Sequence, residues 1–160
     1  RKIDAVCADV DVQIGVNVLA HAAPLDANGL KELARQTGLE WRENGMLYAC
    51  DALGQTLYTV SHLDADKRLK RDEPDLTVPG VTFLIDVPCV KDGASAFDAM
   101  LQTARTLAQQ SGGRLVDDNG APISEQALAR IRDTVTQFQE KMRQAEMPAG
   151  ESRAQRIFSN

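Results

Sequence analysis

The segment from Gly80 to Pro88 constrains the fold more than any other part of the chain. β-Branched and aromatic side chains recur along it with a period of two, which predicts a β-strand. The two sides of this strand would carry Val81, Phe83, Ile85 and Val87 on one and Thr82, Leu84 and Asp86 on the other. Because only the first side is wholly apolar, we expect a sheet that packs on one face and is accessible on the other. Pro88, which has no N–H to donate, should end the strand.

Similar patterns elsewhere predict the rest of the sheet. The further expected strands are residues 10–18, 39–50, 56–63, 115–116 and 122–123. The last two would be joined by a turn at Asp118-Asn119-Gly120. Within residues 39–50, the pair Asn44-Gly45 offers a hairpin turn as an alternative to one long strand.

Three amphipathic patterns predict helices. These cover residues 28–37, 95–110 and 124–142, with Asp26 or Asn28, Ser95 and Ser124 as their N-caps. Residues 64–76 are nearly all charged and are expected to form a surface loop. Hairpins mixed with crossover helices indicate an α+β fold of the split β-α-β type, with a largely antiparallel sheet. Three helices can cover only one face of it, so the other face should stay open.

The length of 160 residues suits one domain with a proper core. We expect the domain to cover residues 10–143, with a flexible lead-in at 1–9 and a disordered tail at 144–160. A net charge of −5 argues against nucleic acid as the main partner. Three cysteines at no metal-like spacing fit a reducing compartment. No segment has the pattern of a membrane span or signal peptide. Because the chain starts at Arg1 without Met, we expect a fragment from which an anchor or a targeting segment has been removed.

The sequence predicts no catalytic residue, metal ligand or cofactor. Ser61 and His62 are adjacent, but neighbours on a strand point to opposite faces and cannot share a proton. Residues 117–120 carry oxygen ligands, yet their spacing is not that of a calcium loop and a turn explains the same residues. The one basic cluster, Lys67, Arg68, Lys70 and Arg71, is either a solvated loop or a docking site for an acidic partner.

Strand parity assigns a mixture of small, uncharged and apolar residues to the open face. That face would carry Gln13, Gly15, Asn17, Leu19, Asn44, Met46, Tyr48, Thr59, Ser61, Leu63, Thr82 and Leu84. With almost no titratable group it is a poor active site. It suits a shallow docking surface, in which Gly15 and Ser61 leave a hollow. Scattered apolar residues are also ordinary on protein surfaces, so these residues alone leave both interpretations open.

The segment Leu76-Thr-Val-Pro-Gly-Val-Thr-Phe-Leu-Ile-Asp-Val-Pro88 resembles the corresponding strand of the ZipA C-terminal domain family. The resemblance continues through Phe97-Asp-Ala-Met-Leu-Gln-Thr-Ala104, Gly112-Gly113 and Leu115-Val-Asp-Asp118, and covers roughly residues 12–143. Two positions depart from the family pattern. A Met that lines the family's groove falls on Asn44, and an aromatic groove position falls on Leu84.

This resemblance implies a six-stranded sheet with three helices on one face and a shallow groove on the other. In that family the groove binds the C-terminal tail of FtsZ, the tubulin-like division protein, without catalysis, and so tethers the Z-ring to the inner membrane. The implied peptide-binding residues are Gln13, Gly15, Asn17, Asn44, Met46, Ser61, Leu63, Thr82 and Leu84. The domain would lie on the cytoplasmic side of the bacterial inner membrane, connected to it only through an N-terminal anchor absent from this fragment.

An RNA-binding or small-ligand-binding split β-α-β domain is the alternative, because RNA-recognition domains also expose a sheet face backed by helices. Such faces need stacking aromatic residues and surrounding basic charge. Tyr48 is the only aromatic residue expected on this face, and the net charge is −5.

Overall fold

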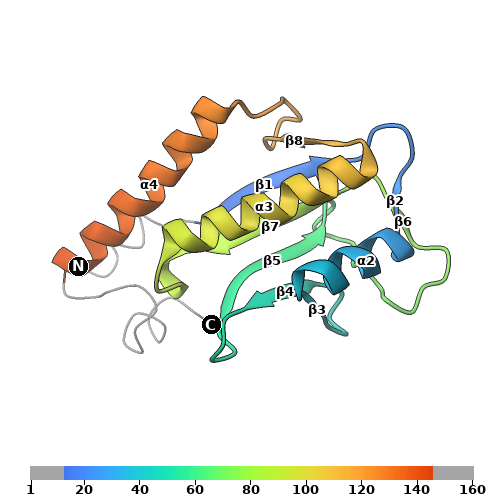
Figure 1. The fold of residues 1–160 in the computed structure, drawn as a ribbon, viewed down its shortest axis with the longest axis horizontal. Coiled ribbons are helices and arrows are strands. Elements are labelled where there is room, and N and C mark those ends of the chain that lie inside the picture. Colours follow the sequence, from blue (N-terminus) through green and yellow to red (C-terminus); the bar gives the residue numbers. More distant parts are fainter. Residues whose placement is uncertain (1–12, 146–160) are drawn as a thin grey trace.

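A six-stranded antiparallel sheet forms the centre of the computed structural model, which describes residues 13–145 (Figure 1). The strands lie in the order β3 (Glu40–Trp41), β4 (Leu47–Cys50), β5 (Thr56–His62), β7 (Gly80–Asp86), β1 (Gln13–Leu19) and β8 (Arg114–Val116). A separate short ribbon pairs β2 (Leu25–Asp26) with β6 (Thr77–Val78). The predicted α+β class and the six-stranded antiparallel sheet are confirmed.

Strand β7 is central, with β1 on one side and β5 on the other. Its burial alternates as predicted: Val81, Phe83 and Ile85 are completely buried, whereas Thr82 and Leu84 are half-buried. The strand ends at Asp86, and Val87–Cys89 form a short 3-10 helix, η1, around Pro88. The period of two in the sequence therefore identified both the strand and the side that faces the core.

Three helices follow the predicted amphipathic patterns: α2 (Ala27–Thr37), α3 (Gly93–Ser111) and α4 (Glu125–Gln144). Asp26 and Ser124 cap α2 and α4 as expected. The expected Ser95 cap of α3 is wrong, because Asp92 takes that place and its Oδ1 accepts a hydrogen bond from the Ser95 N–H at 3.1 Å. An aspartate three residues earlier satisfies the same free N–H group and starts the helix sooner.

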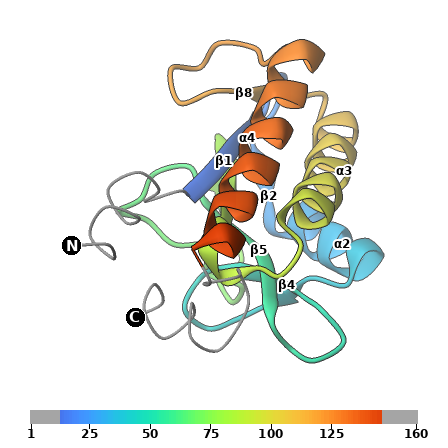
Figure 2. The same cartoon turned by 90° about the vertical axis from the view of Figure 1, so that its left-hand side faces the viewer.

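All three helices belong to one layer, which Figure 2 shows on one side of the sheet. Helix α3 contacts β1, β5, β7 and β8, and α2 and α4 each pack against α3. Phe97, Met100 and Ala104 of α3 are completely buried in this layer. Tyr58 reaches from β5 into it, and its hydroxyl is 2.6 Å from the Thr103 hydroxyl. The core thus lies between the sheet and α3, and the opposite sheet face has no helix over it among the described residues.

Residues 39–50 form a hairpin, so the expectation of one long strand is wrong and its alternative is confirmed. The Arg42 N–H donates to the Met46 carbonyl at 2.9 Å, which closes the turn around Asn44-Gly45. Gly45 has a φ of 84°, a left-handed conformation that glycine adopts without strain. A side-chain carbon on Gly45 would also lie 2.6 Å from Cβ of Arg68, so the neighbouring loop leaves no room for one.

Residues 64–76 are not simply a surface loop, which corrects a second expectation. Leu69 and Leu76 are buried in the core. The indole Nε1 of Trp41 donates to the Leu69 carbonyl at 2.8 Å. The sequence did not predict the burial of these two leucines, because isolated apolar residues among charged ones form no periodic pattern.

The predicted lead-in at 1–9 and residues 10–12 of the first expected strand lie outside the described residues. Of the expected tail, only residues 144–145 are described, at the end of α4.

Candidate functional site

Strand pairing arranges the open face into rows that run across the sheet. One row consists of Tyr48, Thr59, Leu84 and Gly15, and the next of Ser61, Thr82 and Asn17. Directly opposite residues of an antiparallel pair have Cβ atoms about 4.5–5.5 Å apart, so the side chains within each row are neighbours. The register therefore groups Gly15, Asn17, Ser61, Thr82 and Leu84 of the predicted site on one face.

Leu84 fills the space above Gly15. Its Cδ1 lies 3.2 Å from the position that a side-chain carbon on Gly15 would occupy. The hollow expected at Gly15 is therefore wrong, since the missing side chain is replaced by that of the residue opposite. Leu84 is thus the apolar residue of the row that it shares with Gly15, and a side chain at Gly15 would crowd it.

Asn17 is buried, with 6% of its surface exposed. Its Oδ1 accepts from the Thr82 hydroxyl at 2.6 Å, and its Nδ2 donates to the Asp117 carbonyl at 3.2 Å and to Asp118 Oδ1 at 3.3 Å. These bonds fix the turn after β8 against the open face. Both polar atoms of the Asn17 amide are thus engaged within the domain.

A pocket of about 270 Å³ opens where β5 begins and β7 ends. Its lining includes Gln13, Leu57, Thr59, Leu84, Asp86 and Cys89. Gln13 and Leu84 were predicted as site residues, whereas Leu57 was missed although it shares the parity of Thr59 and Ser61. Burial, with additional contributions from the charge and hydrogen bond of Asp86, raises the pKa of the Cys89 thiol to about 11. Cys89 is therefore a protonated thiol at neutral pH.

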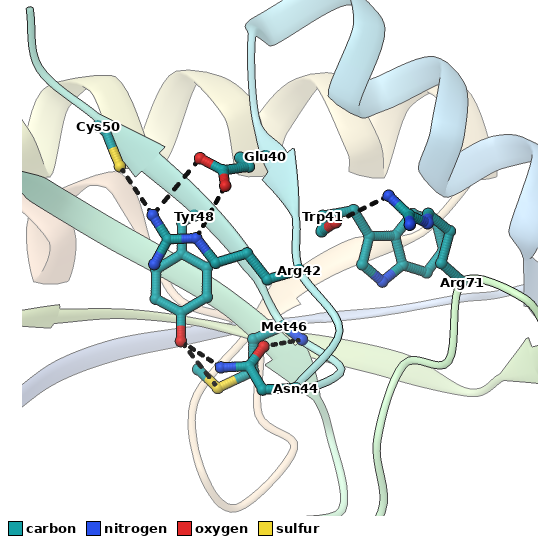
Figure 3. Close-up of polar contacts among 8 residues, drawn as sticks. All are labelled: Glu40, Trp41, Arg42, Asn44, Met46, Tyr48, Cys50 and Arg71. Carbon is teal, nitrogen blue, oxygen red and sulfur yellow. Dashed lines mark hydrogen bonds and ion pairs between the residues drawn. The ribbon is translucent and has the colours of Figure 1, made fainter. Parts of the chain in front are cut away.

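At the other edge of the face lies a group of side chains centred on Arg42 (Figure 3). This edge cluster consists of Glu40, Arg42, Asn44, Met46 and Tyr48. The guanidinium carbon of Arg42 lies 3.8 Å from the centroid of the Tyr48 ring, and Arg42 Nε donates to Glu40 Oε1 at 3.1 Å. The Tyr48 hydroxyl accepts from Asn44 Nδ2 at 2.5 Å and contacts Met46 Sδ at 3.9 Å. Asn44 and Met46 of the predicted site are thereby brought together by Tyr48.

The edge cluster corrects the expectation of a face with almost no titratable groups. Glu40 pairs directly with Tyr48 in the ladder, and Arg42 reaches over the same ring, so both lie on the open face. The hydrogen bond to Glu40 raises the pKa of the Arg42 guanidinium above its ordinary value. The signal was present in the sequence, because residues 40 and 42 have the same parity as 44, 46 and 48.

Hydrogen bonds to backbone carbonyls of the hairpin β3–β4 connect it to residues 64–76, the charged loop. The Leu69 N–H donates to the Gly45 carbonyl at 3.0 Å. Arg68 Nη1 donates to the Asn44 carbonyl at 3.3 Å, and Arg71 Nη1 to the Trp41 carbonyl at 3.2 Å. Two of the four residues in the basic cluster therefore hold the hairpin in position. Between hairpin and loop lies a pocket of about 520 Å³, to which Arg42, Arg68 and Arg71 contribute.

Ser61 and Leu63 are half-buried on the open side, whereas His62 is buried among the residues of the helix side. The Asp64 N–H donates to His62 Nδ1 at 2.9 Å. Burial, followed by the charge of Lys67, lowers the pKa of His62, and the charge of Asp64 opposes the shift. Ser61 and His62 point to opposite faces, as strand parity predicted.

Within residues 13–145, no three His, Cys, Asp or Glu side chains come together in a way that would hold a metal ion. None of the helices in this range is both long and apolar enough to cross a membrane.

The fold is that of an α+β domain whose sheet is backed by helices on one face. The other face presents mixed apolar and uncharged side chains, with the charged pair Glu40 and Arg42 at its edge. The chain belongs to the family described as ZipA, C-terminal FtsZ-binding domain, whose model matches residues 12–134. It is 26% identical over 143 residues to the cell division protein ZipA of Vibrio vulnificus strain YJ016, covering 84% of this chain and 46% of that protein.

Two further ZipA proteins show the same level of similarity. The protein from Marinobacter nauticus is 25% identical over 133 residues, covering 80% of this chain and 39% of the relative. That from Pseudomonas fluorescens is 24% identical over 124 residues, covering 75% and 43%. The chain thus spans less than half the length of these relatives.

Proposed function

We propose that the open face binds the C-terminal tail peptide of FtsZ. The observation that carries this proposal is the burial pattern of β7, which leaves Thr82 and Leu84 accessible on a face that no described helix covers. The family to which the chain belongs is named for FtsZ binding, which supplies the partner. Leu84, Leu63, Met46 and Leu57 supply half-buried apolar surface on which a short peptide gains affinity by desolvation.

The tail would dock apolar side chains at i, i+3 and i+4 spacing across the rows of the face, as helix-in-groove binders do. A shallow surface desolvates only a few side chains, so the affinity should be near micromolar, about −8 kcal/mol. The domain would act without catalysis, on the cytoplasmic side of the inner membrane. Joined to that membrane by an N-terminal anchor, it would tether the Z-ring there.

The alternative of RNA binding is disfavoured by the edge cluster. Single-stranded RNA is bound largely by stacking of bases on aromatic side chains. The ring of Tyr48 has the Arg42 guanidinium 3.8 Å from its centroid, so the face of that ring is already occupied.

A titration with the C-terminal peptide of FtsZ from the same organism tests the proposed function. Saturable binding near micromolar, with chemical-shift changes at Leu84, Thr82 and Ser61, is the expected result, and a scrambled peptide is the control. Binding that leaves these residues unchanged, or no binding at millimolar peptide, would remove the open face as the site.

A further inference from the structure

The guanidinium of Arg42 occupies a position between two surfaces. On one side it covers Tyr48, which belongs to the central row of the open face. On the other it lines the pocket of about 520 Å³ between the hairpin and the charged loop. A peptide that crosses the open face toward β4 therefore meets this guanidinium at the end of its path.

Arg42 is held in place and still retains capacity to bind. Glu40 accepts from Nε at 3.1 Å and from Nη2 at 3.5 Å, and the Tyr48 ring supports the plane of the group. The Arg42 side chain is 38% exposed. Nη2 also donates to Cys50 Sγ at 3.7 Å (Figure 3). A guanidinium has five N–H donors in a planar fork, so the two donors of Nη1 remain for a second carboxylate approaching from solvent. Because its orientation is already fixed, little side-chain entropy is lost when it binds.

The surrounding charges indicate a short-range contact. The pocket combines the cations Arg42, Arg68, Lys70 and Arg71 with the anions Glu43, Asp72 and Glu73. Arg68 and Arg71 are fixed by their bonds to the Asn44 and Trp41 carbonyls. With the two signs nearly balanced, the long-range field is small, so the lysines steer the peptide only modestly and the direct guanidinium–carboxylate contact contributes most to recognition.

We propose that Arg42 determines specificity at the open face by binding a carboxylate side chain of the peptide that docks there. This inference rests on the function proposed above, and it adds a chemical requirement for the partner. The peptide would place an acidic residue over the edge cluster while its apolar residues contact Met46 and Leu84. Glu40 would act as the internal competitor for the same guanidinium.

The test uses two fluorescein-labelled peptides and fluorescence anisotropy. One is the FtsZ C-terminal peptide from the same organism, and the other is a copy in which every Asp and Glu is replaced by Asn or Gln. Both are titrated into the parent domain, Arg42→Gln, Glu40→Gln and the control Arg130→Gln. The control removes one positive charge from an exposed site on α4, in the helix layer. Thermal unfolding of each variant verifies that it is folded.

The parent should bind the acidic peptide roughly three- to tenfold more tightly than the amide copy. Arg42→Gln should remove most of this preference, Glu40→Gln should increase it, and Arg130→Gln should preserve it. If both peptides bind but Arg42→Gln discriminates between them as the parent does, the role of Arg42 is wrong and the proposed function stands. If neither peptide binds the parent, the proposed function itself is wrong.

Discussion

Phe83 and Leu84 are adjacent on β7 and have opposite environments. Phe83 is completely buried on the helix side, with its ring centroid 6.4 Å from that of Tyr58. Leu84 lies on the other side, half-buried above Gly15. Two neighbouring positions thus separate the packing face from the candidate binding face.

Truncation of these two residues should have opposite effects. Leu84→Ala should weaken binding of the FtsZ tail roughly tenfold, because a central apolar anchor typically contributes more than about 1 kcal/mol, and should leave the fold nearly intact. Phe83→Ala should lower the free energy of unfolding by about 3–5 kcal/mol by opening a core cavity. Peptide titration and urea denaturation measure the two quantities. A Leu84→Ala domain that unfolds, beside a stable Phe83→Ala domain, would show that the faces are assigned the wrong way round.

Neutralising the lysines of the basic cluster should affect peptide binding, whereas neutralising its arginines should also affect the stability of the domain. Replacing Lys67 and Lys70 with Gln should weaken peptide binding modestly and reduce its salt dependence, because charges at the rim affect encounter more than retention. Replacing Arg68 and Arg71 with Gln should also lower the free energy of unfolding, since the Asn44 and Trp41 carbonyls lose their donors. Titrations at low and high salt, with urea unfolding, measure both effects. An affinity of the parent that does not change with salt would exclude the loop from the site.

The raised pKa of Cys89 predicts slow alkylation. With a pKa of about 11, set first by burial and then by Asp86, the reactive thiolate is scarce at neutral pH. The rate of iodoacetamide modification should rise about tenfold for each pH unit from 8 to 10. Asp86→Asn should accelerate the reaction at a fixed pH, because one of the charges that oppose the thiolate is removed. Mass spectrometry of the peptide containing Cys89 follows the rate, and a plateau reached below pH 9 would contradict the assignment.

His62 should make the domain less stable in mild acid. Burial and the charge of Lys67 lower its pKa in the folded state, so the folded domain favours the neutral imidazole. As the pH falls below about 6.5, His62 of the unfolded chain binds a proton first, and the free energy of unfolding decreases until the lower folded pKa is passed. Urea unfolding at pH 7.5 and pH 5 measures this loss.

The variant His62→Gln should show a smaller difference between the two pH values. The pKa of Asp98 is lowered mainly by its hydrogen bond with Arg132, so Asp98 stabilises the folded domain at both pH values. That stabilisation is lost only at more acidic pH, and it therefore does not alter the comparison between pH 7.5 and pH 5. An identical pH dependence in the parent and in His62→Gln would assign the effect to other groups.

The parts of the fold that depend on short-range patterns were predictable from the sequence. The faces of β7 follow from the period of two, which places Val81, Phe83 and Ile85 on one side and the mixed set Thr82, Leu84 and Asp86 on the other, and each helix follows from its apolar stripe. The boundaries depend on which of two nearby residues caps a helix, and at α3 the choice of Ser95 over Asp92 was wrong. The rows of the open face needed the strand register, which the alternation of one strand does not contain.

The parts that were missed depend on contacts between distant segments. Leu69 is buried because the hairpin β3–β4 folds over it, with Trp41 bonded to its carbonyl, and nothing near Leu69 in the sequence indicates this. Leu84 fills the space above Gly15 only because the register places them opposite each other. The position of Arg42 over Tyr48 depends likewise on the turn at Gly45, which brings the two strands of the hairpin together.

The first described strand has consequences for biosynthesis. Asn17 of β1 bonds to Thr82, 65 residues later, and to Asp117, 100 residues later. Both ladder partners of β1 are therefore made long after β1 itself, and at about 5–20 residues per second the wait lasts from about 3 to about 20 seconds. During that time the Val16–Val18 segment exposes apolar side chains and unpaired backbone, which favours aggregation. A truncated product that stops before β7 would keep this strand permanently without its partners, so we expect such products to need a chaperone or to be degraded.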